Sequence, residues 1–201
     1  MSTGAKQSLA NVCLSLLDPE DEVLLPCPYW VSYAEIIKLA EGVPVEIKST
    51  IDSDFKITPS QLEASITSRT KMIMFSSPCN PSGTVYTQSE LEAIAKMLDK
   101  YPNIYIVSDE IYEHINFTDK HYSIGTIPSM KDRTVTVNGV SKGFAMTGWR
   151  VGFIGAPLWI AKACNKIQGQ VTSATCAIAQ KATERAMLAE PRSTTKEMKE
   201  T

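Results

Sequence analysis

The sequence lacks the features that mark membrane-bound, secreted and disulfide-rich proteins. No apolar run approaches the roughly 20 residues that are needed to cross a bilayer, and the opening residues MSTGAKQSLA contain no apolar stretch of a secretory signal. The five cysteines are odd in number and form no C-x-x-C pair, which argues against a disulfide framework or a zinc site. We therefore expect a cytoplasmic protein without a membrane partner.

A strong excess of charge of either sign is also missing. The 20 Lys and Arg and 22 Asp and Glu leave a formal net charge of -2, which argues against a nucleic-acid partner held by a basic surface. Apolar residues make up 43% and charged residues 21% of the 201 residues, as in ordinary globular proteins. A disordered, collagen-like or coiled-coil chain is thereby excluded, and a single substantial core is expected.

Short strand-like runs alternate with helix-like patterns along the chain. Strands are predicted at 22–25, 43–47, 71–75, 104–107, 134–137 and 151–154, and helices at about 5–17, 31–40, 59–67, 87–99, 157–168 and 173–189. Most strand runs are almost continuously apolar, as expected for strands that are buried on both faces of a parallel sheet. The alternation predicts an α/β fold, a three-layer α/β/α sandwich with a mainly parallel sheet.

Polar residues follow three of the predicted strands. In an open parallel sheet, ligands bind beyond the carboxyl ends of the strands, and here those positions carry SDEIY (108–112), NGVSK (138–142) and SSPCNPSGT (76–84). One edge of the sheet would thus hold an acid, a phenol, an amine and an amide. Taken singly, such residues have ordinary explanations. An Asp after a strand usually caps a turn or helix, and a lone Lys is usually solvated.

Two nucleotide-binding alternatives and a metal site lack support. The segment IYIVSDE resembles the magnesium-holding strand of P-loop NTPases, but the chain has no G-x-x-x-x-G-K-[ST] loop. It has no G-x-G-x-x-G fingerprint of a nicotinamide-binding domain either. His114 and His121 are expected to be structural or solvated, because no further metal ligands are evident beside them.

Residues 139–152, GVSKGFAMTGWRVG, are less generic. They resemble the lysine signature of the class I/II aminotransferases, which are pyridoxal-phosphate (PLP) enzymes of fold type I. SPCNPSGTVY and VSDEIYEHI match two further motifs of that family in the same order. The resemblance runs from about Gly4 to residue 190 and looks closest to the aspartate aminotransferase branch. It implies a PLP-binding large domain at 1–190, truncated at its N-terminal side, with 191–201 starting the connection to a missing small domain.

The resemblance gives the central chemistry to four residues. Lys142 would form a Schiff base with the cofactor aldehyde and then move a proton between the substrate and the cofactor. Asp109 would keep the ring nitrogen of the cofactor protonated by charge pairing. Tyr112 and Asn80 would hydrogen-bond the phenolic oxygen of the cofactor.

The same resemblance implies a phosphate site. Arg150 has a planar guanidinium that suits a bidentate phosphate contact. The backbone N–H groups of Gly4, Ala5 and Lys6 open the first predicted helix, and a helix N-terminus favours an anion. Many relatives carry a phosphate-binding Ser three residues before the lysine; this chain has a glycine there, and Ser141 is the expected substitute.

Two further features are carried over from the family. Trp30 matches the aromatic residue that stacks on the cofactor ring in the aspartate branch. Cys27-Pro28 and Asn80-Pro81 fall where relatives carry cis peptide bonds, and only X-Pro bonds adopt that form at small cost. We predict that at least Asn80-Pro81 is cis.

Lys6, Trp30 and Asn80 are the predicted substrate contacts. In an aspartate-type subset of the family, a Lys at the position of Lys6 pairs with the side-chain carboxylate of acidic substrates. The resemblance thus implies transamination of aspartate or glutamate with a 2-oxo acid, in a protein that is a homodimer at full length. An aromatic or prephenate-type aminotransferase, another PLP reaction such as β-elimination, and a catalytically incompetent fragment remain open, since the family's α-carboxylate-binding Arg has no match in this chain.

Overall fold

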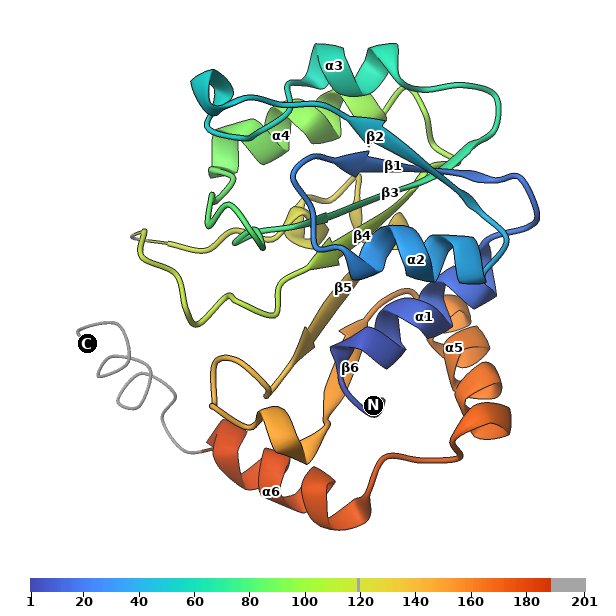
Figure 1. Cartoon of the computed structure of the whole chain (residues 1–201), viewed down its shortest axis with the longest axis vertical. Coiled ribbons are helices and arrows are strands. Elements are labelled where there is room, and N and C mark those ends of the chain that lie inside the picture. Colours follow the sequence, from blue (N-terminus) through green and yellow to red (C-terminus); the bar gives the residue numbers. More distant parts are fainter. Residues whose placement is uncertain (119, 189–201) are drawn as a thin grey trace.

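The computed structural model describes residues 1–118 and 120–188, and it shows one sheet with helices on both faces (Figure 1). The strands are β1 (Glu22–Pro26), β2 (Val43–Ile47), β3 (Thr70–Ser76), β4 (Tyr105–Asp109), β5 (Thr134–Gly139) and β6 (Gly152–Gly155). Their order across the sheet is β2-β1-β3-β4-β5-β6. All neighbours pair in parallel except β6, which is antiparallel to β5. The predicted mainly parallel α/β sandwich is confirmed.

The helices form two outer layers. Those packed on one face are α1 (Ala5–Leu16), α2 (Ser32–Leu39) and α5 (Leu158–Val171), and those on the other are α3 (Pro59–Ala64) and α4 (Gln88–Leu98). A sixth helix, α6 (Ala177–Leu188), lies near the β6 end of the molecule (Figure 1). Sequence-distant helices such as α1 and α5 therefore share one layer.

Side chains of the central strands point alternately to the two faces of the sheet, which explains why both faces are covered by helices. Val23 and Leu25 of β1 belong to the core under α1, α2 and α5. Leu24, between them, belongs to the opposite core with Leu62 of α3 and Leu91 of α4. All five side chains are buried. Successive residues of a strand point to opposite faces, so an uninterrupted apolar run supplies both cores at once.

Two helices begin within one residue of their predicted starts at 59 and 87. The Thr58 hydroxyl accepts a hydrogen bond from the Gln61 N–H at 3.2 Å, and Pro59 opens α3. The Thr87 hydroxyl accepts one from the Glu90 N–H at 3.3 Å at the start of α4. Such caps satisfy N–H groups that have no acceptor within the helix, which stabilises the helix start locally.

Three of the described X-Pro peptide bonds are cis. Cys27-Pro28 and Asn80-Pro81 are both cis, as expected, and Ser77-Pro78 is a third cis bond. Helix α5 continues to Val171, three residues beyond its predicted end. The predicted connection at 191–201 lies outside the described residues. Among the residues that are described, no helix has the length and apolar character to span a membrane.

Candidate active site

A cavity of about 270 Å³ lies at the carboxyl ends of the parallel strands. Ser76 and Asp109, the last residues of β3 and β4, lie in its wall, as does Lys142, which follows β5. Every predicted site residue except Gly4 lines this cavity, namely Ala5, Lys6, Trp30, Asn80, Asp109, Tyr112, Ser141, Lys142 and Arg150. Residues from five separate segments of the chain therefore meet at one place.

Asp109 is a buried carboxylate with two hydrogen-bond donors. Tyr33 of α2 donates its hydroxyl to Asp109 Oδ2 at 2.7 Å, and the Ile111 N–H donates to Oδ1 at 3.2 Å. Burial raises the pKa of Asp109 from 3.8 to about 6; the two hydrogen bonds oppose this rise and the neighbouring Glu110 adds to it. The group is therefore largely ionised at neutral pH, in a place where a charged carboxylate is stable only with a partner.

Tyr112, Asn80 and Lys142 form a second group on the cavity wall. Asn80 Nδ2 donates to the Tyr112 hydroxyl at 3.4 Å, and Lys142 Nζ lies 5.7 Å from the centroid of the Tyr112 ring. A turn after β4 brings Tyr112 to the same side as Asp109, since the Glu113 N–H donates to the Glu110 carbonyl at 2.9 Å. An amine, a phenol and an amide are thus near neighbours.

Arg150 lies against the start of α1. Gly4 caps α1 with φ +89°, and a Cβ at this glycine would lie 3.0 Å from Arg150 Cζ, so the guanidinium occupies the space that a side chain would fill. Arg150 Nη1 also donates to the Thr147 carbonyl at 2.7 Å. Within the described part of the chain, the N–H groups of Ala5 and Lys6 have no acceptor. Free N–H groups beside a guanidinium suit a phosphate.

The segment before α1 is attached to the edge strand, and this attachment places the helix start. The Ser2 N–H donates to the Gly152 carbonyl at 2.7 Å, and the Gly152 N–H donates back at 3.0 Å. A Cβ at Gly152 would lie 2.8 Å from Ala5 Cα, so the close approach of α1 to β6 requires a glycine. Gly4 thus lies against the Arg150 guanidinium but is not among the residues that line the cavity.

Lys6 and Trp30 cover one side of the cavity. Lys6 Nζ lies 4.7 Å from the centroid of the Trp30 ring, a cation–π distance. Trp30 in turn packs edge-on against Tyr33, with ring centroids 5.7 Å apart and planes at 87°. The indole therefore contacts both the amine from α1 and the phenol that holds Asp109.

Four residues of the cavity wall were missed from the sequence: Tyr33, Ser76, Ile111 and Thr147. A signal existed for two of them. Ser76 ends a predicted strand at the ligand-binding edge. Tyr33 follows Trp30 by three residues at the start of a helix, and residues at that spacing share a helix face.

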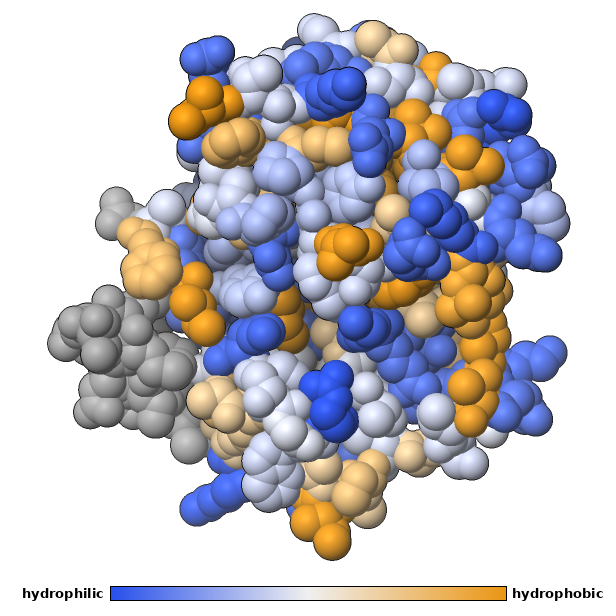
Figure 2. Space-filling view, viewed as in Figure 1, coloured by the Kyte–Doolittle hydropathy of each residue, from blue (hydrophilic) through white to orange (hydrophobic). Residues whose placement is uncertain are grey.

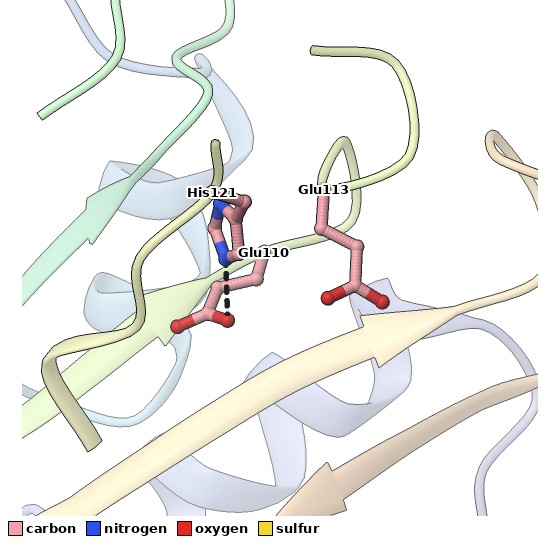
Figure 3. Close-up of side chains that lie close together, drawn as sticks. All are labelled: Glu110, Glu113 and His121. Atoms are coloured by element: carbon pink, nitrogen blue, oxygen red, sulfur yellow. Dashed lines mark hydrogen bonds and ion pairs between the residues drawn. The ribbon is translucent and has the colours of Figure 1, made fainter. Parts of the chain in front are cut away.

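Glu110, Glu113 and His121 also come together (Figure 3). Their nearest ligand atoms lie within 4.8 Å of one another, so the expectation that His121 has no such neighbours was incomplete. His121 Nε2 lies 2.9 Å from Glu110 Oε2, and Glu110 Oε1 accepts hydrogen bonds from Ser108 at 2.9 Å and Ser123 at 2.6 Å. Both oxygens of Glu110 are thereby used, and the cluster attaches the loop after β4 to that strand.

The cavity combines the groups that a phosphorylated aromatic aldehyde requires. It offers an amine for the aldehyde, a buried carboxylate for a ring nitrogen, and a guanidinium with free helix N–H groups for the phosphate. This donor set fits pyridoxal phosphate, and the fold and site define a PLP-type α/β domain. The chain belongs to the aminotransferase class I and II family, whose model matches residues 1–201.

Curated relatives agree with that membership. The chain is 49% identical over 189 residues to the aspartate/prephenate aminotransferase of Nitrosomonas europaea, which covers 93% of this chain and 48% of that protein. It is 48% identical over 183 residues to the bifunctional aspartate aminotransferase and glutamate/aspartate-prephenate aminotransferase of Petunia hybrida, covering 90% of this chain and 38% of that one. The chain thus spans about half the length, or less, of these relatives.

Solved structures show the same fold. The aspartate aminotransferase from Rhizobium meliloti matches with a TM-score of 0.95 and 41% identity, over 99% of this chain and 50% of that chain. An aromatic aminotransferase from Pyrococcus horikoshii matches with a TM-score of 0.95 and 38% identity, over 99% of this chain and 53% of that chain. The resemblance seen in the motifs is confirmed at the level of the family and the fold.

Proposed function

We propose that the whole protein is a PLP-dependent aminotransferase of the aspartate type, which transfers the amino group of aspartate or glutamate to a 2-oxo acid. The observation that carries this proposal is that Lys142, Asp109 and Arg150 line one cavity. The names of the relatives support it, because they include both aspartate and prephenate aminotransferases. A prephenate-type reaction is for that reason the second candidate.

Lys142 has the proton-transfer role. Pyridoxal phosphate, when bound, supplies an aldehyde that condenses with amines and a ring that accepts the electron pair left by a departing substrate proton. The Lys142 amine is half-buried beside the Tyr112 ring. In its neutral form, Nζ accepts the proton that leaves the substrate α-carbon and delivers it at the other end of the transfer.

Asp109, Tyr112 and Asn80 set the charge distribution around the ring. The Asp109 carboxylate holds a proton on the ring nitrogen, because two opposite charges stabilise each other strongly in a buried place. Tyr112 and Asn80, already hydrogen-bonded to each other, donate to the phenolic oxygen. Together these residues favour the form of the ring that accepts electrons.

The phosphate is held by the side chains of Arg150 and Ser141 and by the backbone N–H groups of Ala5 and Lys6. Their donors are a guanidinium, a hydroxyl and the free N–H groups of a helix start. Trp30 covers one face of the ring. These residues would hold the phosphate and Asp109 would hold the ring nitrogen, and Lys142, in the wall of the same cavity, would supply the amine for the aldehyde.

The test uses the full-length protein with added PLP. We expect a visible absorbance band from the covalently attached cofactor, and transfer of the amino group of aspartate to 2-oxoglutarate with formation of oxaloacetate and glutamate. Release of ammonia without a new amino acid would indicate β-elimination instead. Absence of the visible band would contradict the PLP assignment itself, whereas transfer from aromatic donors or to prephenate alone would favour the second candidate.

Lys6 is expected to select acidic substrates. Lys6→Ala should lower kcat/KM for aspartate by about 10- to 100-fold, the usual cost of losing a hydrogen bond to a charged group, and change kcat/KM for phenylalanine little. The physical reason is that the Lys6 ammonium, which lies over the Trp30 ring, is free to pair with a side-chain carboxylate. Steady-state kinetics with both donors measure the ratio. Lys162→Ala, an exposed lysine of α5, is the matched control, and equal losses for both donors in Lys6→Ala would contradict the assignment.

We further propose that the whole protein is a homodimer in the cytoplasm. Large apolar side chains remain exposed on the helices of the C-terminal half, including Leu158 at 70% and Ile178 at 76%. Figure 2 shows hydrophobic residues gathered along the edge where Figure 1 places α5. A second copy, or the portion of the relatives that this chain does not span, would cover them. All five cysteines are free, which suits a reducing compartment.

The chain alone is expected to bind the cofactor but to transfer amino groups poorly. The cavity contains the cofactor-binding groups, and no arginine other than Arg150 lines it. A substrate α-carboxylate therefore lacks a second guanidinium within the described residues. Activity is therefore measured with the full-length protein.

A further inference from the structure

Tyr33 is bonded directly to the carboxylate on which the proposed chemistry depends. It lies in the first turn of α2, and its side chain is 1% exposed. Its hydroxyl donates to Asp109 Oδ2 at 2.7 Å. Across residues 1–118 and 120–188, no other side chain donates to Asp109; the second donor is the backbone N–H of Ile111.

The surroundings of Tyr33 keep its proton in place. Burial, followed by the negative charge of Asp109, raises the pKa of Tyr33 well above 10. The edge-on contact with Trp30 fixes the direction of its ring. The phenol is therefore protonated at neutral pH, where it donates to the Asp109 carboxylate.

A hydrogen bond donated to a carboxylate makes that carboxylate a weaker base. One proton is shared between Asp109 and whatever base faces its other side. If Asp109 becomes more basic, the proton moves to the carboxyl group; if Asp109 becomes less basic, the proton stays on the facing base. Tyr33 keeps its own proton in both cases, so the total number of protons on Tyr33, Asp109 and the facing base is unchanged.

We propose that Tyr33 is a positioning residue that acts through Asp109, holding the carboxylate ionised so that the shared proton resides on the ring nitrogen of the cofactor. This inference rests on the proposed function, because it concerns the same cavity. It goes beyond the roles given to Lys142, Asp109 and Arg150, because it explains why a buried carboxylate that forms no ion pair with the described residues remains charged.

Other charged or titratable groups also surround this pair. They come from α1, from the loops after β3 and β4, and from the segment after β5: Lys6, Cys79, Glu110, Tyr112, Lys142 and Arg150. A change from Tyr33 to Phe leaves all of them in place. It removes one hydroxyl, so a change in the titration of Asp109 then reports the hydrogen bond rather than the remaining charges.

The decisive experiment measures Asp109 in the full-length apoprotein by NMR. Aspartate labelled with ¹³C at the carboxyl group gives a signal for Asp109, which is assigned by its absence in Asp109→Asn. We expect Tyr33→Phe to raise the titration midpoint of Asp109 by about one pH unit, a tenfold change that is at the low end for a hydrogen bond to a charged group. Tyr86→Phe is the matched control: Tyr86 is buried, and its hydroxyl accepts from the Ile57 N–H at 3.1 Å in the other core. This control should leave the midpoint unchanged.

A second variant keeps the test decisive if Tyr33→Phe does not fold. Incorporating 3-fluorotyrosine at position 33 preserves the shape of the ring and makes the phenol a stronger donor, so the midpoint of Asp109 should fall. A folded Tyr33→Phe protein with an unchanged midpoint, or no shift with 3-fluorotyrosine, overturns the proposal.

The PLP-loaded protein supplies an independent readout. Tyr33→Phe should lower kcat about tenfold with little change in KM, and it should have no further effect in an Asp109→Asn background, since Tyr33 acts through Asp109. An additive loss in the double variant overturns the proposal. If instead the wild-type protein shows no visible cofactor band, the proposed function fails, and the apoprotein titration still decides whether Tyr33 controls Asp109.

Discussion

Replacing Lys142 with alanine is expected to abolish amino-group transfer by the full-length protein, with kcat falling by about 10⁴-fold or more. The size of the effect has two causes. The variant loses the amine that attaches the cofactor covalently, and it loses the base that moves the proton. Among the described residues that line the cavity, the remaining amine is that of Lys6, whose Nζ lies over the Trp30 ring.

Single-turnover absorbance measurements check this prediction. In Lys142→Ala, the visible band of the covalently attached cofactor should disappear, while PLP itself is still retained through Arg150 and the start of α1. Lys96→Ala, an exposed lysine of α4, serves as the control and should behave like the wild-type protein. Turnover within tenfold of wild type in Lys142→Ala would remove Lys142 from the proposed mechanism.

The second large effect is expected at Asp109, where function and stability should change in opposite directions. Asp109→Asn keeps the shape of the side chain but removes its negative charge. Turnover of the PLP-loaded full-length protein should fall by about 10²- to 10³-fold, the usual cost of removing one electrostatic partner from an enzyme site. The same change should stabilise the apoprotein at neutral pH, because burial makes the Asp109 carboxylate costly to ionise even with its two hydrogen-bond donors.

The sign and the pH window of the stability change follow from the raised pKa. Between about pH 4 and pH 6, folded Asp109 retains a proton that the unfolded chain has released, because burial raises its pKa from 3.8 to about 6. Stability therefore falls as the pH rises through this window, and the full cost of roughly 3 kcal/mol is present above it. Asn does not titrate, so the variant avoids this cost.

Urea unfolding of the two apoproteins tests this prediction at about pH 4.5 and about pH 8. Asp109→Asn should be more stable than wild type by up to roughly 3 kcal/mol at the higher pH, and the difference should shrink at the lower pH. Asp132→Asn, at an exposed position, should show no such difference. A gain that is equal at both pH values would show that ionisation of Asp109 is not its cause.

Local patterns in the sequence were sufficient for the elements of the fold. The apolar runs of the central strands bury residues on both faces, and each of them became a strand of the sheet. The caps at Thr58 and Thr87 set helix starts, because a cap involves residues three positions apart and needs no distant partner. The end of α5 was missed: the predicted end lies directly before Gly169, but the helix continues through this glycine to Val171, because helix propensity is a weak signal that tertiary context can override.

The contacts between distant residues were not readable from the sequence. Tyr33 and Asp109 are 76 positions apart, and the phenol reaches the carboxylate because α2 packs on the face of the sheet where β4 ends. His121 meets Glu110 through a loop whose path no periodicity describes. The positions of such loops are decided by the side chains that they contact, which come from other parts of the chain.

By itself, the sequence determined the α/β class, the strand-end location of the cavity and the family, since these depend on periodicity, on the ends of buried strands and on contiguous motifs. Only the tertiary structure decided that nine predicted residues share one cavity, that the Arg150 guanidinium occupies the space beside Gly4, and that Tyr33 donates a hydrogen bond to Asp109. The physical reason is that hydrogen bonds and burial depend on distances in space, and a linear pattern specifies such distances only within a single helix, strand or turn.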